Sequence, residues 1–294
     1  MRENINQVAK YLGWMFLCAL VVVLVVDFFK QGIFNDKTGI NLLVVGDENM
    51  GVLVIRPESN LVNWVPLPTN LKVKIYNSAA TYPINSLWSF GIKEHKAYQI
   101  TEKSIGAMMG IVTPRLIKID HVANVENLLG KFLAFGLKTD LTIRDRWYIR
   151  KIVSDAAVSK KIFEQEIPKA AFDKVTEADG KEFLVVNKVI DVWTKDKFYH
   201  DDILSEGAEV SINNLSEVQG AGLMLSDQLD SAGFRVVDVV NDNKDDIKAD
   251  GCRFLASKKF PLSVIYLIDQ VGCIPLPSSE KKETSDNLIK IWLK

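Results

Sequence analysis

A long apolar run dominates the first part of the hydropathy pattern. Residues 11–29 hold a single charged side chain, Asp27, which lies two places from the end of the run. At 1.5 Å of rise per helical residue the run spans about 28 Å, close to the roughly 30 Å hydrocarbon core of a bilayer. The pattern therefore predicts a single transmembrane helix that anchors a globular part.

Two other interpretations of this run have specific weaknesses. A cleaved signal peptide ends in small residues at alternate positions, whereas residues 27–34 hold three phenylalanines and no alanine. A helix in a protein core has a polar face, but residues 17–26 are apolar all round. Charge leaves the side of the membrane open, because the basic residues that flank the run are balanced. They are Arg2, Lys10, Lys30 and Lys37.

Short apolar runs after residue 37 predict a mixed sheet. Residues 40–45, 52–55 and 61–65 are continuous and rich in branched side chains, which is typical of strands buried on both faces. The turn-forming segment 57–60 separates the second strand from the third. Residues 71–75 alternate apolar side chains with lysines, which predicts a half-exposed strand.

The period then changes to that of helices. Residues 100–109 predict a helix that stops at Gly110, and residues 115–119 predict a further strand. Two more amphipathic helices are expected over residues 121–135 and 141–153, the second with Thr142 as its N-cap.

The helix predicted over residues 141–153 carries a cluster of cationic side chains. They are Arg144, Arg146, Arg150 and Lys151. Such a cluster can grip phosphate, but long cationic side chains more often occupy the solvent-facing side of a helix, here near the membrane surface. We expect the second role.

The rest of the chain predicts a linker and a small α/β unit. Residues 164–182 are charged and interrupted by proline and glycine, which indicates a linker with short helical pieces. Ser216 and Gln219 predict a capping box for a helix that stops at Gly233. With strands near 210–212, 234–240, 253–256 and 288–293 and a second helix over 260–271, the order is βαββαβ.

The predicted division is 1–37 for the cytoplasmic tail, anchor and connector, 38–163 and 207–294 for two α/β domains, and 164–206 for the linker.

Composition narrows the function classes. The formal net charge is −1, and basic residues do not interleave with aromatic ones, so nucleic-acid binding is disfavoured. Cys18 lies in the apolar run. For Cys252 and Cys273 the sequence leaves open a disulfide or two small buried side chains.

Local motifs in the last segment resemble the C-terminal domain of LytR-type cell-envelope proteins. The resembling stretches are Asn214-Leu215-Ser216-Glu217-Val218-Gln219-Gly220 and Ala232-Gly233-Phe234-Arg235-Val236-Val237-Asp238-Val239. The middle of the chain, residues 40 to about 160, resembles the LytR-CpsA-Psr (LCP) domain. Its resembling stretches are Leu42–Gly46, Pro57–Asn60, Pro83–Trp88 and Met109–Pro114.

The resemblance implies a membrane-anchored, extracytoplasmic protein of a bacterial envelope. LCP proteins move a glycan-phosphate from a polyprenyl-pyrophosphate lipid to a wall acceptor. That chemistry needs Mg on carboxylates and several arginines to neutralise charge on phosphate oxygens. Aligned on the strands, the family's first acidic residue falls at Glu48, beside Asp47, which are the remnant catalytic candidates. Its Ile-Pro-Arg-Asp motif falls on Leu67-Pro68-Thr69-Asn70, which has lost both charges.

Between residues 40 and 114 the only arginine is Arg56. Removal of one preorganised donor costs about 3 kcal/mol of transition-state stabilisation, and here several are missing together. We therefore expect a non-catalytic protein that binds or organises an envelope polymer, a polyprenyl lipid or an envelope protein, without a cofactor. The alternative is an active transferase that uses Asp47 and Glu48 with Mg. Asn85, Arg115 and Asn214 are further ligand-binding candidates.

Other chemistries find little support in the sequence. His95, His121 and His200 lack the spacing of metal ligands, so no metal site is expected from them. The chain also lacks a Gly-x-Ser-x-Gly elbow and a phosphate-binding Gly-Lys-Ser/Thr loop.

Overall fold

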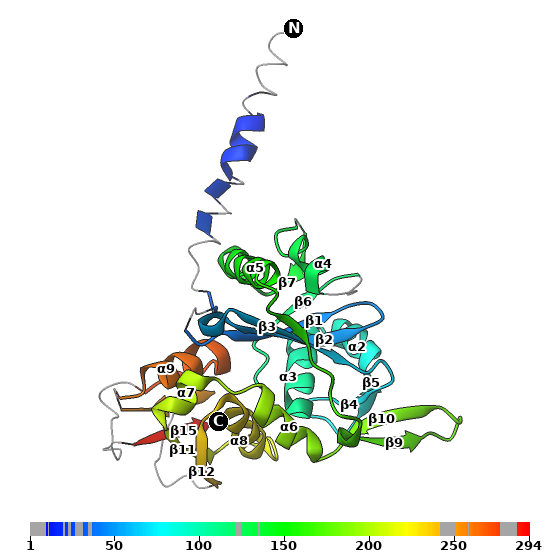
Figure 1. Ribbon diagram of the computed structural model, residues 1–294, viewed down its shortest axis with the longest axis vertical. Helices are drawn as coiled ribbons and strands as arrows, with labels where there is room; N and C mark the ends of the chain where they lie inside the picture. Colours follow the sequence, from blue (N-terminus) through cyan, green and yellow to red (C-terminus); the bar gives the residue numbers. More distant parts are fainter. Residues whose placement is uncertain are drawn as a thin grey trace.

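The computed structural model describes the chain from residue 10 to residue 294 with gaps (Figure 1). The described residues are 10, 12–19, 21–22, 25–26, 32–34, 37–120, 125–134, 136–241, 251–257, 259–276 and 287–294. Within these ranges, no helix combines the length and the apolar character that a membrane crossing requires. The described positions of the run 11–29 are helical, and their large apolar side chains, such as Trp14 and Phe16, are exposed. The other positions of the expected span lie outside the described residues.

The first lobe is built on a six-stranded mixed sheet with the strand order β7-β6-β1-β2-β3-β8. The strands are β1 (Ile40–Val45), β2 (Met50–Arg56), β3 (Leu61–Leu67), β6 (Arg115–Lys118), β7 (Lys138–Thr139) and β8 (Ile162–Glu164). Successive side chains of a strand point to opposite faces of its sheet. Leu42 and Val44 accordingly lie in one core cluster, and Leu43 and Val45 lie in another. The expected strand with two buried faces is confirmed.

Helices cover both faces of this sheet and make three layers. They are α2 (Leu87–Lys93), α3 (Ala97–Met109), α4 (Val125–Leu129) and α5 (Ile143–Val158). Ile105 of α3 packs into the cluster of Leu43, and Ile149 of α5 packs into the cluster of Leu42. The expected helix over 100–109 is confirmed, and Gly110 ends it with a positive φ of 61°. Residues 121–124 and 135 of the helix expected over 121–135 lie outside the described residues.

The N-terminus of α5 follows the sequence expectation. The Thr142 hydroxyl accepts a hydrogen bond from the Asp145 N–H at 3.1 Å, and the Asp145 carboxylate accepts one from the Thr142 N–H at 3.3 Å. These two bonds form a capping box that satisfies donors at the start of the helix. The other carboxylate oxygen of Asp145 accepts a bond from the Phe34 N–H at 3.0 Å. The start of α5 therefore also holds the connector.

The segment 164–206 differs from the linker-like interpretation. It contains the hairpin β9 (Phe172–Thr176) and β10 (Glu182–Val186), then α6 (Val189–Lys197) and α7 (Asp201–Glu206). Ile167, Ile190 and Phe198 are buried in the same core cluster as Leu43. Charged side chains of residues 164–182 lie on the exposed hairpin, whereas apolar side chains of the segment complete the first core. A second hairpin, β4 (Lys72–Lys74) and β5 (Thr81–Pro83), lies beside β10.

The second lobe is a five-stranded mixed sheet with the order β12-β11-β15-β13-β14. Its strands are β11 (Glu209–Asn214), β12 (Arg235–Val240), β13 (Cys252–Leu255), β14 (Ile274–Pro275) and β15 (Leu288–Leu293). Its helices are α8 (Ala221–Ala232) and α9 (Pro261–Tyr266), and α9 continues as a π-helical turn, Leu267–Val271. The expected βαββαβ order is confirmed, with the short β14 added before the last strand.

The capping box expected at Ser216 and Gln219 is wrong. Helix α8 begins at Ala221, and its N-cap is Gly220 in a left-handed conformation with φ 81°. The Ser216 hydroxyl donates instead to the Asn214 side-chain oxygen at 2.7 Å. Gly220, with its positive φ, lies between Ser216 and the helix. Ser216 therefore hydrogen-bonds at the end of β11 and does not cap α8.

The capping box at α5 predicts a measurable stability effect. The substitution Thr142→Ala removes the hydroxyl acceptor and is expected to lower the free energy of unfolding by about 1 kcal/mol. Thr142→Ser keeps the hydroxyl and is the matched control. Urea unfolding followed by circular dichroism measures both, and equal stability of the alanine and serine variants would contradict the assigned cap.

Candidate ligand-binding groove

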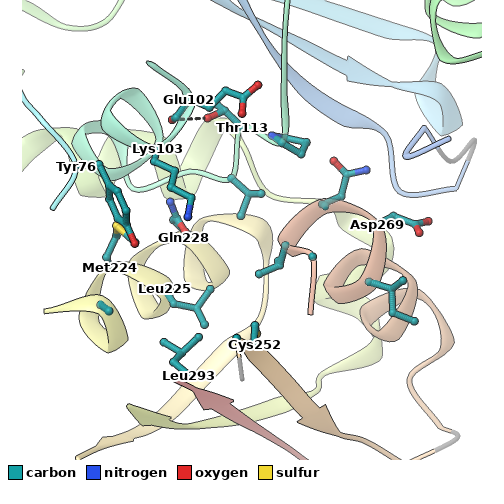
Figure 2. A pocket seen from close by; sticks show the side chains of 18 of the residues that line it. Tyr76, Glu102, Lys103, Thr113, Met224, Leu225, Gln228, Cys252, Asp269 and Leu293 are labelled. Atoms are coloured by element: carbon teal, nitrogen blue, oxygen red, sulfur yellow. Dashed lines mark hydrogen bonds between the residues drawn. The ribbon is translucent and has the colours of Figure 1, made fainter. Parts of the chain in front are cut away.

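A groove of about 720 Å³ lies between the two lobes (Figure 2). The first lobe contributes α3, the segment 112–115 and Tyr76, and the second contributes α8, the π-helical turn and the strand ends at Cys252 and Leu293. Gly32 and Ile33 of the connector also line it. Because both lobes build its walls, the groove exists only while their relative placement is kept.

One wall of the groove is polar and the base is apolar. Figure 2 shows Lys103, Tyr76 and Gln228 gathered on one side, with Leu225, Leu293 and Cys252 beneath them. The Lys103 ammonium lies 4.9 Å from the centre of the Tyr76 ring, a cation–π distance. The wall therefore offers a cation, an aromatic hydroxyl and an amide above an apolar surface.

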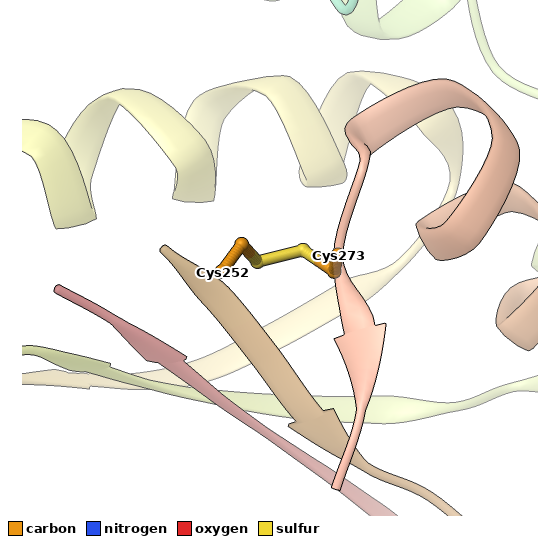
Figure 3. The surroundings of a disulfide bond; sticks show 2 residues. All are labelled: Cys252 and Cys273. Carbon is orange, nitrogen blue, oxygen red and sulfur yellow. A yellow bond between two sulfur atoms is a disulfide. The ribbon is translucent and has the colours of Figure 1, made fainter. Parts of the chain in front are cut away.

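A disulfide supports the base of the groove. Cys252 at the start of β13 is bonded to Cys273, which follows the π-helical turn (Figure 3). The sequence left this pairing open, and the structure resolves it as a bond. Gly251 and Gly272, the neighbours of the two cysteines, both line the groove. The bond thus ties together two chain segments that share one wall.

Two carboxyl groups meet at the rim of the groove. Glu102 of α3 and Asp140, which follows β7, share a hydrogen bond between their side chains. Burial, the Asp140 charge and the shared bond together raise the pKa of Glu102 to about 9, against the opposing charges of Arg115 and Lys103. Burial also raises the pKa of Asp140, while the Leu116 N–H at 3.0 Å and the Arg115 charge act in the opposite direction. The pair therefore holds a proton at neutral pH.

The structure places the sequence candidates in two groups. Arg115 lines the groove, with its Nε atom 3.7 Å from an Asp140 oxygen, and Asn214 accepts a bond from Ser216, which also lines the groove. Asp47 and Glu48 lie on an exposed turn between β1 and β2, and Asn85 is exposed before α2. These last three residues are absent from the groove lining.

The acidic turn does not fit a Mg site. Asp47 is ion-paired with Lys118 of β6, so this carboxylate already has a cationic partner with which a metal would compete. The described part of the chain contains no group of three or more His, Cys, Asp and Glu side chains in metal-binding arrangement. We therefore derive no step through Mg at this turn.

Arg56 contributes to the joint between the lobes. Its guanidinium group is buried and donates to the Asn41 side-chain oxygen at 3.1 Å and to the Phe198 carbonyl at 2.7 Å. Burial lowers its pKa to about 10. His200 lies two residues after Phe198, and its backbone N–H donates to the Ala232 carbonyl at the end of α8. The His200 ring lies edge-on against Tyr266 of α9 at 5.1 Å. Arg56 thus belongs to a buried contact that runs into the second lobe.

Sequence reasoning missed the residues that define the groove. Glu102 and Asp140 are 38 positions apart, and Lys103 and Gln228 are farther apart still. No local motif joins them, since they meet only through the packing of α3 against α8 and β6.

Comparisons with known proteins give structural neighbours only. No family profile matches the sequence, and no curated protein matches it. The solved structures to which it is similar are LCP-family proteins. Bacillus subtilis TagT is 10% identical, with a TM-score of 0.42 over 57% of this chain and 93% of TagT. Listeria innocua Lin1025 is 14% identical, with a TM-score of 0.39 over 54% of this chain and 98% of Lin1025. TagT bound to LIIa-WTA is 10% identical, with a TM-score of 0.39 over 56% of this chain and 91% of that one. A likeness of this size leaves the chemistry of the groove to the residues of this chain.

The carboxyl pair predicts a pH-dependent stability. Because the pKa of Glu102 is raised from 4.5 to about 9, the folded protein keeps a proton in this interval that the unfolded chain loses. The free energy of unfolding should therefore fall as the pH rises from about 4.5 to about 9.

The substitution Glu102→Gln keeps the shape and removes the titration, so its stability should decline less over this interval. Glu94→Gln, at an exposed glutamate after α2, is the control and should keep the decline. Thermal unfolding across the pH range measures the slopes. Parallel curves for the wild type and Glu102→Gln would contradict the shared proton.

Proposed function

We propose that this chain is a membrane-tethered protein of a bacterial envelope that binds or organises an envelope polymer in the groove between its lobes. The observation that carries the proposal is the placement of charge. At the acidic turn, Asp47 is paired with a lysine, and residues 67–70 at the end of β3 are Leu-Pro-Thr-Asn, without an ionisable side chain. The polar wall with Lys103, Tyr76 and Gln228 lies instead between the lobes.

The arginines that an LCP-like reaction would need have other partners. Arg56 is buried against Asn41 and Phe198, and Arg115 lies beside Asp140. Arg146 donates to the carbonyls of two residues in the loop before β7. Phosphoryl transfer relies on cations that are preorganised at the transferring group, so these placements favour binding over catalysis.

Two features support a tether and an extracytoplasmic position. The described positions of the run 11–29 are helical with exposed apolar side chains, which is costly in water and favourable in lipid. The Cys252–Cys273 disulfide belongs to an oxidising compartment, since thiols are kept reduced in the cytosol. The resemblance to LytR-type proteins implies the same location.

The groove chemistry favours a polymer that carries both anionic and hydroxyl groups. Lys103 can pair with a phosphate, and Gln228 and the Tyr76 hydroxyl can hydrogen-bond to sugar or glycerol oxygens. A polyprenyl lipid and an envelope protein are the other ligands that the resemblance implies.

Obstruction of the groove should abolish this binding. The substitution Met224→Trp places a large ring on the α8 wall and is expected to weaken the binding of poly(glycerol phosphate) at least tenfold, a loss of about 1.4 kcal/mol. Leu223→Trp changes the neighbouring position, which is 64% exposed and outside the groove lining, and should bind like the wild type. Isothermal titration of the detergent-solubilised full chain measures both. Equal affinities would overturn the assignment of the groove.

The alternative function is an active transferase that uses Asp47 and Glu48 with Mg. We expect the full chain with Mg and a polyprenyl-pyrophosphate-linked glycan to release no product above a protein-free control. Chromatographic separation of the lipid products is the measurement. Turnover that disappears in the variant Glu48→Ala would establish the alternative and reject a binding role.

A further inference from the structure

We propose that the outer face of α5 is a contact surface for anionic membrane lipids. This inference rests on the proposed tether and adds a second, electrostatic contact to it. The surface consists of Arg144, Trp147, Arg150 and Lys151, and each of these side chains is exposed. We call it the α5 basic face.

The connector joins the apolar helix directly to α5. The Phe34 N–H donates to Asp145 at 3.0 Å, and the Phe34 ring stacks on Tyr148 at 6.0 Å. Ile33 is buried in the core cluster that includes Ile149. An extended chain rises at most about 3.6 Å per residue, so Val26 lies within roughly 22 Å of Gly32. In the view of Figure 1, α5 lies on the side of the body from which the N-terminal helix projects.

Two side chains of the α5 basic face, Arg144 and Trp147, lie against one aromatic ring, that of Tyr148. Trp147 meets Tyr148 edge-on at 5.1 Å, and the Arg144 guanidinium carbon lies 5.7 Å from the centre of the Tyr148 ring. Because the same Tyr148 ring stacks on Phe34, these contacts fix Arg144 and Trp147 relative to the connector. The surface therefore lies a short stretch of chain away from the proposed tether.

The chemistry of this surface matches a lipid interface. Trp147 is 45% exposed, although a large aromatic side chain gains by burial. Tryptophan is enriched at the level of lipid headgroups, and arginine and lysine near a membrane are attracted to anionic lipids. Leu133, in the loop before β7, is a further exposed apolar side chain of the elements that pack against α5. The nearest acidic side chain on the exposed part of α5 is Asp155, one turn beyond Lys151.

Fluorescence of the full chain in lipid vesicles tests this inference. The probe is the emission of Trp147, taken as the difference between the wild type and Trp147→Phe. The vesicles contain phosphatidylcholine with or without phosphatidylglycerol, and bromine near the top of the acyl chains quenches tryptophans that reach that depth. We expect loss of most of the Trp147 emission with phosphatidylglycerol, and its recovery at high salt, which screens the charges.

Two variants that each remove three positive charges distinguish an effect of the α5 basic face from an effect of the protein's net charge. The triple variant Arg144→Gln, Arg150→Gln, Lys151→Gln should restore the Trp147 emission. The control triple variant Lys174→Gln, Lys188→Gln, Arg235→Gln removes as many exposed cations from β9, the start of α6 and β12, and should remain quenched.

Extraction of the vesicles at alkaline pH distinguishes failure of this inference from failure of the tether. Protein retained in the vesicles with unquenched Trp147 would overturn the α5 contact alone and leave the face free for a soluble acidic partner. Quenching that is equal in both triple variants would overturn the role of charge. Protein released by alkali would overturn the tether and the α5 contact together.

Discussion

The contact between the two lobes involves the segment after α6, which hydrogen bonds from the buried guanidinium group of Arg56 hold in place. A charge without water must have each of its hydrogen-bond donors satisfied, and Arg56 uses the Asn41 side chain and the Phe198 carbonyl for this purpose. Phe198 leads into His200, which contacts both α8 and α9. Arg56 and both partners belong to the first lobe, so this interaction fixes the segment that carries His200, and the His200 contacts hold α8 and α9 against it.

Two acidic sites of the first lobe have their charge neutralised within the protein. The acidic turn keeps its carboxylates, but one of them is neutralised by Lys118. A second carboxyl pair, Glu102 and Asp140, is neutralised by a shared proton. The Asp47–Lys118 ion pair and the proton shared by Glu102 and Asp140 both weaken the local electrostatic field. A weak electrostatic field of this kind is in keeping with the proposed function, in which many weak hydrogen bonds hold the ligand.

The elements of this fold were largely readable from the sequence, because local patterns encode them. The strand β15 follows residues 288–293 as expected, and the cap of α5 at Thr142 was visible from residue type and position. The segment 164–206 is not predicted correctly because charged residues, proline and glycine dominate its first part, whereas the burial of side chains such as Ile167 and Phe198 depends on tertiary packing. The cap of α8 was misread because Gly220 adopts a left-handed conformation that no side-chain pattern reveals.

The candidate site was less predictable than the fold. Arg115 was named from the sequence, but its partner Asp140 and the neighbouring Glu102 lie in separate elements. A shared proton depends on burial and on distances between residues that are remote in sequence, so it follows from tertiary packing alone. The sequence does not decide the Cys252–Cys273 disulfide for the same reason, because the bond can be inferred only when the separation of the two cysteines in space is known.

The short connector at Gly32 and Ile33 limits where a ligand can be captured. Both residues line the groove, and Ile33 also accepts a hydrogen bond from Gln270 at 2.9 Å. Five residues separate Val26 from Gly32, so the connector side of the groove lies within roughly 22 Å of Val26 in the apolar helix. With the proposed tether in place, this protein would sample only the thin layer next to the bilayer and could engage a polymer only near its membrane-attached end.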